Sequence, residues 1–399
     1  MNYNSINLAK AHLINYPCPL NINFLWNYGF LLGIVFFIQI LTGVLLATCY
    51  TPEISYAYYS VQHILRELWS GWCFRYMHAT GATFVFILTY LHILRGLNYS
   101  YSYLPLSWIS GLLIFLISIV TAFMGYVLPW GQMSFWGATV ITNLLYFIPG
   151  LVSWICGGYT ISDPTLKRFF VLHFIFPFIA LCIVFIHIFF LHLQGSSNPL
   201  GYDTALKIPF YPSLLCLDIK GFNNVLVLFL AQSLFGILPL AHPDNAIVVD
   251  RYVTPLHIVP EWYFLPFYAM LKTIPNKTAG LLVMIASLQL LFLLAEQRNL
   301  TSLIQFKFAF GAREYSVPTI WFICSFYALL WIGCQLPQSI FILYGRLFII
   351  LFFFSGFFTL VQSRRVHYDY SSQANIKYYK AAMRRHFWVL SGTKQTVRL

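Results

Sequence analysis

The feature that most constrains the fold of this chain is a series of long, almost uncharged apolar runs. Hydrophobic residues make up 59% of its 399 residues and charged residues only 9%, whereas soluble domains carry about 25% charged residues. A helix needs about 20 apolar residues to cross roughly 30 Å of hydrocarbon, and its backbone polar groups must be satisfied within the segment. The sequence therefore predicts an all-α polytopic membrane protein whose eight transmembrane helices lie near residues 27–50, 75–97, 108–128, 169–193, 222–240, 278–295, 317–335 and 340–361.

Polar segments between these runs predict the domain organisation. Residues 1–26 form an N-terminal segment, and residues 27–193 form a bundle of four helices. A loop over residues 194–221, with several Gly, Pro and Ser, separates this bundle from a second block of four helices over residues 222–361. Residues 362–399 form a basic tail.

The formal net charge of +12 is unevenly distributed along the chain. With an even number of spans, both termini lie on the same side of the membrane. Most of the 23 Lys and Arg fall in the termini and in the loops on that side. This positive-inside pattern predicts that both termini face the cytoplasm or its mitochondrial equivalent, the matrix. The basic tail is then expected to contact anionic membrane lipids or a partner subunit, and no nucleic-acid partner is expected.

The first 20 residues contain one Lys and no Arg. A secretory signal would combine a basic region with an apolar one, and a mitochondrial transit peptide would be rich in Arg. We therefore expect that a mitochondrial form of this chain is encoded and made inside the organelle.

Four histidines lie within two of the predicted helices at equal spacing. His78 and His92 are fourteen residues apart, and so are His173 and His187. At about 100° per residue, fourteen steps bring both histidines of a helix to nearly the same face, about 21 Å apart along the axis. The two helices are separated by one span and therefore run parallel. His78 then shares a membrane level with His173, and His92 shares one with His187.

Two imidazoles at each level indicate a metal site of a particular kind. A single intramembrane histidine is often only a hydrogen-bonded core residue, but four at two identical spacings are harder to explain in that way. Zinc would require a third or fourth ligand at the same level, and the eight cysteines are scattered without a C-x-x-C pair. Two imidazoles leave room for a planar macrocycle whose iron is held from both faces, and such a saturated iron should carry electrons.

Glycines repeat the same spacing in the neighbouring helices. Glycine is unfavourable inside a helix unless another group must approach closely, and the edge of a porphyrin is such a group. Small-residue packing between membrane helices is the alternative explanation. The glycines are Gly29 and Gly43 in the first span and Gly111 and Gly125 in the third.

Two arginines flank the first histidine pair. Arg75 lies three residues before His78, and Arg95 lies three residues after His92. Because a haem carries two propionates, we expect each arginine to neutralise propionates at its own membrane level. The same positions also suit arginines that extend from helix ends to the membrane surface.

Several motifs occur in an order that resembles the mitochondrial cytochrome b family. They are the paired histidines, GQMSFWGATVITNL at 131–144, HLQGSSNPLG at 192–201 and PEWYFLPFYAMLKTIPNK at 260–277. The resemblance covers approximately residues 20–362. The segment at 146–158 is shorter than in animals or yeast, which resembles the form in apicomplexan parasites and their relatives.

The resemblance implies a catalytic subunit of quinol:cytochrome c oxidoreductase, respiratory complex III, in the mitochondrial inner membrane. It implies two non-covalent haem b groups, a lower-potential one between His78 and His173 at the outer level and a higher-potential one between His92 and His187 at the matrix level. It also implies that ubiquinol is oxidised at an outer site and ubiquinone is reduced at a matrix-side site, coupled to proton translocation in the Q cycle. The implied partners are the Rieske iron–sulfur protein, cytochrome c1 and the other subunits of a homodimeric complex.

A carboxylate near the outer level suits quinol oxidation. Glu261 is one of only eleven carboxylates in the chain and follows Pro260 in the PEWY motif. Beside an apolar pocket such a carboxylate can act as a general base of raised pKa, although a solvated loop glutamate would give the same sequence. By the resemblance, the residues that line this quinol pocket are Tyr126, Met133, Gly137, Ile141, Pro260, Phe264 and Tyr268.

The resemblance also implies a quinone site at the matrix level. His192 lies about 140° off the ligand face of its helix, so it is not expected to bind the same iron as His187. By the resemblance, it instead binds a quinone carbonyl, with Ser196 and Asp218 opposite. Leu217 stands where the family usually has Lys, so proton delivery at this site is expected to differ. Trp108 matches a position that contacts a haem propionate.

Two other interpretations remain open from the sequence. A proton-coupled transporter could use the histidines as an intramembrane relay, although such proteins more often show inverted repeats and helices broken near the midplane. A different dihaem membrane anchor would lack the PEWY motif and the last four spans.

Overall fold

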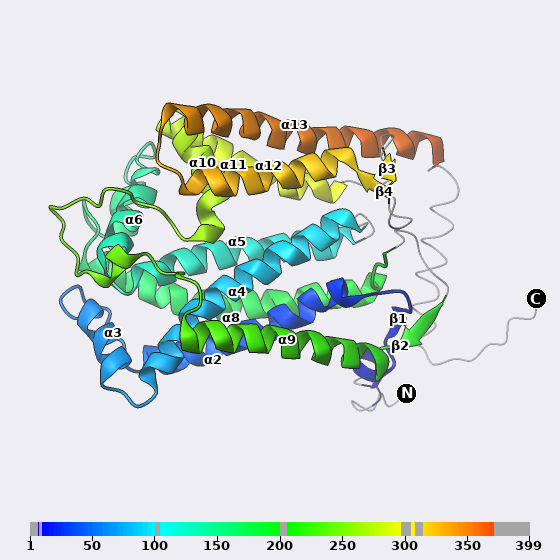
Figure 1. Ribbon diagram of the computed structural model, residues 1–399, viewed down its shortest axis with the longest axis horizontal. Coiled ribbons are helices and arrows are strands. Elements are labelled where there is room, and N and C mark those ends of the chain that lie inside the picture. The colour runs from blue at the N-terminus through cyan, green and yellow to red at the C-terminus, as the bar shows by residue number, and fades with distance from the viewer. Residues whose placement is uncertain are drawn as a thin grey trace, which may run out of the picture.

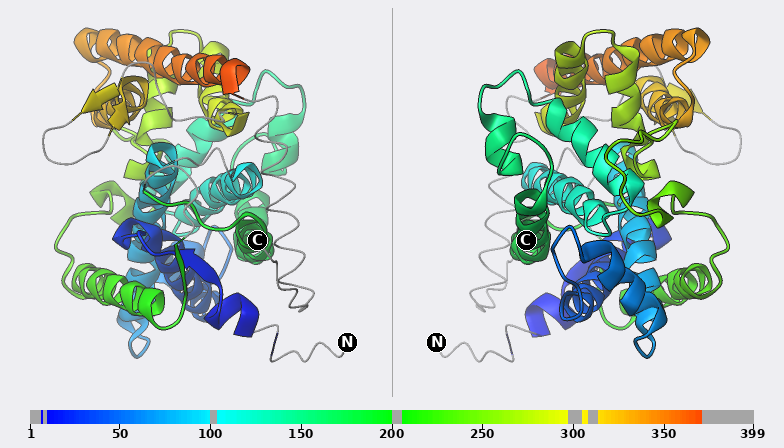
Figure 2. Two further views of the ribbon diagram at one scale, coloured as in Figure 1. Left: turned by 90° about the vertical axis from the view of Figure 1, so that its right-hand side faces the viewer. Right: turned by 90° about the vertical axis from the view of Figure 1, so that its left-hand side faces the viewer.

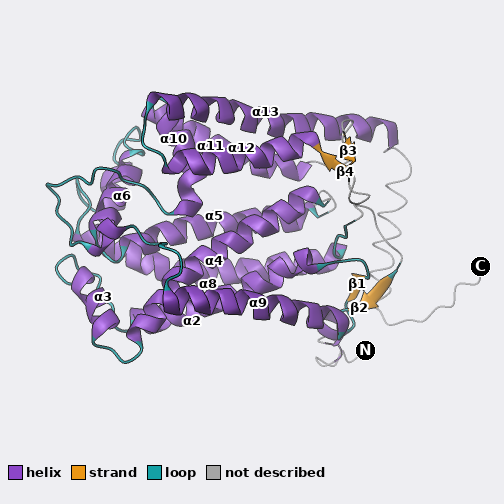
Figure 3. Cartoon of the chain, in the orientation of Figure 1, coloured by secondary structure: helices purple, strands orange, loops and turns teal. Residues whose placement is uncertain are grey.

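The computed structural model of the chain describes residue 7 and residues 10–99, 104–199, 206–296, 305–307 and 314–370. At residues 296, 305–307, 314–317 and 359–370 it describes the backbone alone. Helices make up most of the described residues (Figure 3), so the predicted all-α class is confirmed. The predicted basic tail lies outside the described residues except for its first part, to Tyr370, which continues the last helix.

The long helices follow the predicted apolar runs (Figure 1). They are α2 (Tyr28–Ala47), α4 (Gly71–Asn98), α5 (Pro105–Val127), α8 (Asp163–Gln194), α9 (Ser213–Phe235), α11 (Lys277–Leu293), α12 (Val317–Cys334) and α13 (Ser339–Tyr370). Shorter helices lie at Lys10–Ile14, Phe24–Asn27, Ala57–Arg66 (α3), Gln132–Asn143 (α6), Leu151–Cys156 (α7), Pro243–Ala246, Trp262–Phe264, Leu265–Thr273 (α10) and Leu294–Glu296.

Among the described residues, six helices are long and apolar enough to cross a membrane. The predicted number of eight is therefore not confirmed. The other two predicted spans correspond to α11 and α12, whose apolar helices, Lys277–Leu293 and Pro318–Cys334, are shorter. At 1.5 Å per residue such a helix reaches about 26 Å, slightly less than the roughly 30 Å of a hydrocarbon core.

One boundary of the predicted domain organisation is wrong. The loop predicted over residues 194–221 ends early, because α9 begins at Ser213 and not near residue 222. Leu214 and Asp218, four residues apart and therefore on one helix face, are both buried. Packing of this face supports a helix where the charged residues Asp218 and Lys220 suggested a loop.

The helices form two groups, which the end-on views of Figure 2 separate. In the first group α2 packs against α4, and α5 packs against α8. In the second group α10, α11, α12 and α13 pack on one another around a core that includes Met270, Leu329 and Ile332. The predicted division into an N-terminal bundle and a C-terminal block stays a prediction, and α9, which it assigns to the C-terminal block, packs on α4 of the first group.

The long helices run between two distinct ends of the molecule (Figure 1). At one end lie α3 and α6, and we call it the α6 end. At the other end strand β1 (Pro17–Pro19) pairs antiparallel with strand β2 (Lys207–Pro209), and we call it the β1–β2 end. A second antiparallel pair joins β3 (Gln305–Lys307) to β4 (Glu314–Ser316) near the end of α13.

Candidate functional site

The histidines of α4 and α8 face each other in two pairs. The ring centres of His78 and His173 are 6.2 Å apart near the α6 end, and those of His92 and His187 are 6.3 Å apart near the β1–β2 end. A metal–imidazole bond is about 2.0–2.1 Å, and each ring centre lies roughly 1 Å behind its nitrogen. Two imidazoles on opposite sides of one metal ion therefore have centres roughly 6 Å apart, which both pairs satisfy.

Hydrogen bonds orient three of these four rings. His78 Nδ1 is 3.0 Å from Thr42 Oγ1, and the hydroxyl of Thr42 donates to the Ile38 carbonyl at 2.7 Å. Because its proton is used there, the Thr42 oxygen accepts from His78 Nδ1–H. The tautomer that results carries no proton on Nε2, so that nitrogen can bind a metal.

The same logic applies to His187 and His173. His187 Nδ1 is 3.0 Å from Ser110 Oγ, whose hydroxyl donates to the carbonyls of Leu106 at 2.8 Å and Ser107 at 3.0 Å. His173 Nδ1 donates to the carbonyl of Thr121 at 2.8 Å, since a carbonyl can only accept. Both rings therefore also present an unprotonated Nε2.

His92 has a different neighbour. Its Nδ1 lies 3.4 Å from a terminal nitrogen of Arg95, which can only donate. The Nε nitrogen of Arg95 is buried and has no hydrogen-bond partner within the described part of the chain, while its guanidinium lies 5.1 Å from the ring centre of Trp26. A buried cationic donor without a partner suits an anionic group bound beside His92.

Each predicted glycine lies against one of the four histidines. If a Cβ were added to each glycine, its nearest neighbour would be Cε1 of a histidine ring. In α2 this distance would be 3.4 Å from Gly29 to His92 and 3.1 Å from Gly43 to His78. In α5 it would be 3.1 Å from Gly111 to His187 and 2.4 Å from Gly125 to His173. In the structure the imidazole ring itself approaches the glycine backbone. A porphyrin edge at these glycines stays a prediction.

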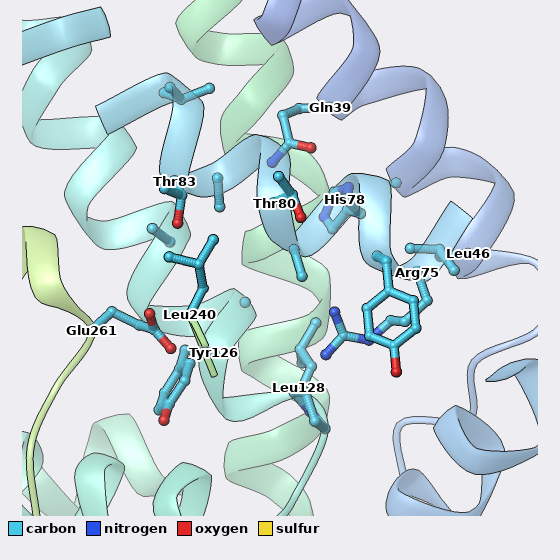
Figure 4. A pocket seen from close by; sticks show the side chains of 18 of the residues that line it. Gln39, Leu46, Arg75, His78, Thr80, Thr83, Tyr126, Leu128, Leu240 and Glu261 are labelled. Carbon is cyan, nitrogen blue, oxygen red and sulfur yellow. The ribbon is translucent and has the colours of Figure 1, made fainter. Parts of the chain in front are cut away.

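A cavity of about 680 Å³ opens at the α6 end. Its lining includes His78, His173, Arg75, Tyr126 and Glu261 (Figure 4). Its volume lies within the range of pockets that enclose small molecules, about 300–1,000 Å³. In Figure 4 the Arg75 guanidinium points into this space, as expected for a group that neutralises an anion there.

Contacts with α4 hold Glu261 at the edge of the cavity. The indole of Trp262 donates to Thr83 Oγ1 at 3.3 Å, and the ring of Tyr263 stacks on Phe86 with centres 4.1 Å apart. The Tyr90 hydroxyl donates to the carbonyl of Tyr263. The two residues after Glu261 are thus fixed on α4, and the carboxylate lies beside Tyr126 (Figure 4).

The electrostatic surroundings of Glu261 suit proton transfer. Burial raises the pKa of its carboxyl to about 7, and the positive charge of Arg75 opposes this rise only in part. A carboxyl with a pKa near neutrality can both accept and release a proton at physiological pH. The interpretation as an ordinary solvated glutamate does not fit this partly buried position.

The other residues expected at the quinol pocket lie outside the lining of this cavity. Met133 is buried, and a Cβ added to Gly137 would meet nothing within 4 Å. The Tyr268 hydroxyl donates to the Ile258 carbonyl at 3.1 Å, which holds the chain just before Pro260. Phe264 packs edge-on against Phe86 and Tyr263, and Ile141 is exposed.

At the β1–β2 end, the residues of the expected quinone site have separate environments. The ring of His192 stacks on that of Tyr16, with centres 4.3 Å apart. Asp218 is buried in α9, and the carbonyl of Leu217 accepts from Asn27 Nδ2 at 2.8 Å. Ser196 Oγ donates to the carbonyl of its neighbour Ser197 at 3.2 Å.

Trp108 makes a hydrogen bond between two helices. Its indole nitrogen donates to the carbonyl of Leu291 at 2.9 Å, which joins α5 to α11. The contact of Trp108 with a haem propionate stays a prediction.

Sequence reasoning did not find Thr42, Ser110 and Thr121, which orient the histidine rings. A signal exists for two of them, because Thr42 and Ser110 directly precede the spaced glycines Gly43 and Gly111. Thr121 acts through its backbone carbonyl, which any residue could supply.

Together, the four histidines and the two arginines are suitable residues for holding haem. Each level offers two imidazoles at a suitable separation, and the described residues contain no group of three or more His, Cys, Asp or Glu side chains that could hold another metal ion. Arg75 and Arg95 add a cation at each level.

Comparisons with known proteins agree with this arrangement. A family model described as Cytochrome b/b6/petB matches residues 13–195, and another described as Cytochrome b(C-terminal)/b6/petD matches residues 248–353. Cytochrome b of Plasmodium berghei is 83% identical over 376 residues, which cover 94% of this chain and all of that protein. Cytochrome b of Toxoplasma gondii is 55% identical over 356 residues, which cover 88% of this chain and 96% of that protein.

A solved structure named Hyperthermophilic respiratory Complex III is also similar, with a TM-score of 0.82 and 32% identity. The similarity covers 91% of this chain and 97% of that chain. The fold and the site thus define a helical membrane protein with two stacked pairs of histidines. The chain belongs to the cytochrome b family, and its similarity to the Plasmodium proteins fits the predicted apicomplexan type. Because the C-terminal family model matches, the alternative of a shorter dihaem anchor is excluded.

Proposed function

We propose that this chain is the dihaem cytochrome b subunit of respiratory complex III and oxidises ubiquinol and reduces ubiquinone at two separate sites. The observation that carries this proposal is the pair of histidine levels, each with ring centres about 6 Å apart and each ring lying against a glycine. A proton relay would not require two imidazoles at metal-binding separation on each level.

The chain's own residues would hold two haem b groups. His78 and His173 would bind one iron, and His92 and His187 the other, through the Nε2 atoms. When bound, the haems supply one-electron carriers between the two ends of the molecule. Arg75 would neutralise propionates at the α6 end, as would Arg95 at the β1–β2 end.

At the α6 end, Glu261 would act on quinol. Quinol becomes quinone by losing two electrons and two protons, and the carboxylate of Glu261 would accept one phenolic proton. Burial of this carboxyl raises its pKa to about 7, so the group can release the proton again to water. Tyr126 lies in the same cavity and would position the ring.

At the β1–β2 end, His192 would donate a hydrogen bond to a quinone carbonyl, with Asp218 and Ser196 nearby. Reduction of quinone takes up two protons, and groups that titrate at this end would supply them. The β1–β2 end would then face the matrix, and the α6 end the intermembrane space.

The assembly follows from the same proposal. The Rieske protein and cytochrome c1 would receive electrons at the α6 end, in a homodimeric complex within the mitochondrial inner membrane. The similarity to a chain of a respiratory complex III supports this. Both termini would then lie on the matrix side.

The substitution Glu261→Gln tests the quinol site. Because an amide cannot accept the proton, we expect quinol oxidation by the purified complex to slow by about 100-fold, within the usual range for general bases. Both haem bands should remain. The control is Glu53→Gln, since Glu53 is an exposed carboxylate that lies 3.7 Å from Lys167. Loss of haem in Glu261→Gln, or an unchanged rate, would mean that Glu261 has another role.

A further inference from the structure

The N-terminal segment is fastened to the β1–β2 end by backbone hydrogen bonds on both sides of the strand pair. The amide of Phe210 donates to the Tyr16 carbonyl at 2.9 Å, and the amide of Tyr211 donates to the Ile14 carbonyl at 3.1 Å. Together with the pairing of β1 and β2, these bonds hold residues 10–19 across the end of α8. The short helix Lys10–Ile14 therefore has a defined place beside the candidate quinone site.

Two rings of this segment lie against His192. Tyr16 stacks on it at 4.3 Å between centres with an interplanar angle of 28°. His12 also lies parallel to it, at 5.6 Å and 11°. His12 is partly exposed, and its neighbours Lys10, Ala11 and Leu13 are exposed. The imidazole of His12 is thus partly open to solvent and lies parallel to that of His192.

Two titratable groups beside this position, Tyr16 and Cys18, do not suit proton delivery near neutral pH. Burial raises the pKa of the Tyr16 phenol. Burial, and secondarily the charge of Asp218, raises the pKa of the Cys18 thiol to about 11. The remaining charged groups of the surrounding elements are Lys10 in the same segment, Lys207 in β2 and Asp218 in α9. Imidazole is the side chain that ordinarily titrates near neutrality.

We propose that His12 is the proton-relay residue of the matrix-side quinone site. This proposal rests on the proposed function, in which quinone at His192 takes up two electrons and two protons. His192 would donate its N–H proton to the quinone oxygen as the oxygen becomes a hydroxyl, His12 would replace that proton, and water would reprotonate His12. As the quinone is reduced, the π bond of each carbonyl opens and an O–H bond forms at each oxygen. His192 would supply the proton for one oxygen, water would supply the proton for the other, and the two electrons would come from the bound haems.

The geometry permits this relay through one water molecule. The ring centres of His12 and His192 are 5.6 Å apart, a separation at which one water molecule can hydrogen-bond to a nitrogen of each ring. A proton donor that acts through one bridging water is within working distance. The relay also accounts for Leu217, an apolar residue in the position where a lysine is usual in the family.

The substitution His12→Gln removes the imidazole and keeps a polar side chain of similar size. The complex would be reduced, mixed with a short-chain ubiquinone, and followed in stopped flow by reoxidation of the haem that His92 and His187 hold. At about pH 8 we expect reoxidation to slow by about 10–100-fold, with less slowing at about pH 6, where solvent protons are more abundant. Added imidazole should restore most of the rate.

The matched control is His63→Gln, since His63 is an exposed histidine in α3 at the opposite end, and it should react at the wild-type rate. An unchanged rate in His12→Gln with both haem bands present would overturn the relay. A slow rate that neither imidazole nor low pH restores would also overturn it, because His12 would then serve packing alone. Failure of the wild-type complex to reduce ubiquinone would instead refute the proposed function itself.

Discussion

At the scale of single residues, hydrogen-bond acceptors beside Nδ1 set the tautomer of the rings that we propose bind haem iron. Thr42 and Ser110 have already given their hydroxyl protons to backbone carbonyls, so they accept from His78 and His187. An acceptor on Nδ1–H raises the basicity of the ring. A more basic imidazole stabilises ferric over ferrous iron and so lowers the potential of the haem it holds.

Removal of one acceptor should therefore shift one haem only. We expect Thr42→Val to raise the midpoint potential of the haem at the α6 end by tens of millivolts. A hydrogen bond contributes about 1 kcal/mol, and a shift of about 59 mV changes the equilibrium constant of a one-electron reduction tenfold. Ser110→Ala should raise the potential of the other haem. Potentiometric titration of the haem bands measures both.

Thr48→Val is the control for Thr42→Val, because Thr48 is exposed at the end of α2. Its hydroxyl hydrogen-bonds to the Leu45 carbonyl and the Cys49 thiol and not to a histidine. A downward shift, or an equal shift of both haems, would contradict the assigned tautomers.

The raised pKa of Glu261 gives a pH dependence with a defined sign. Only the unprotonated carboxylate accepts a proton, and the pKa of this carboxyl is about 7. The rate of quinol oxidation should therefore rise between about pH 6 and pH 8 and then level off. The profile is measured by steady-state assay, and this step should be absent in Glu261→Gln. A rate that is flat over this range would exclude Glu261 as the base.

At the scale of elements, the spacing of fourteen residues predicted much of the site. It predicted the faces of α4 and α8, the pairing of levels and the glycines of α2 and α5, because an unbroken helix converts sequence spacing into geometry. It did not predict that the glycines accommodate imidazole rings, since this depends on the rotamers of another helix. The start of α9 and the docking of His12 depend on contacts between distant segments and were also missed.

The glycines form a graded series that tests this packing. An alanine Cβ at Gly125 would lie 2.4 Å from the His173 ring, whereas at Gly29 it would lie 3.4 Å from the His92 ring. We expect Gly125→Ala to lose the haem at the α6 end and Gly29→Ala to retain both haems. Haem content per chain, from the pyridine haemochrome spectrum, is the measurement.

Gly33→Ala is the matched control in α2, because a Cβ there meets nothing within 4 Å. Its haem content should equal that of the wild type. If Gly125→Ala binds both haems normally, close approach of ring and backbone is not what requires glycine at this position.

At the scale of the whole molecule, the two ends should face different compartments. Cys49, after α2, and Cys216, in the first turns of α9, are both exposed and lie on opposite sides of the predicted membrane. In sealed inner-membrane vesicles with the intermembrane face outward, a membrane-impermeant maleimide should label Cys49 and spare Cys216. The reverse pattern would invert the proposed orientation and exchange the locations of the two quinone sites.

The most direct test of the account is a reduced-minus-oxidised spectrum of the purified protein combined with a redox titration. We expect two b-type haems per chain with distinct midpoint potentials, one for each histidine pair. Replacement of His78 should remove the component at the α6 end, and replacement of His92 should remove the other. A protein that folds in the membrane and shows no haem band would contradict the account and favour the alternative of a proton-coupled transporter.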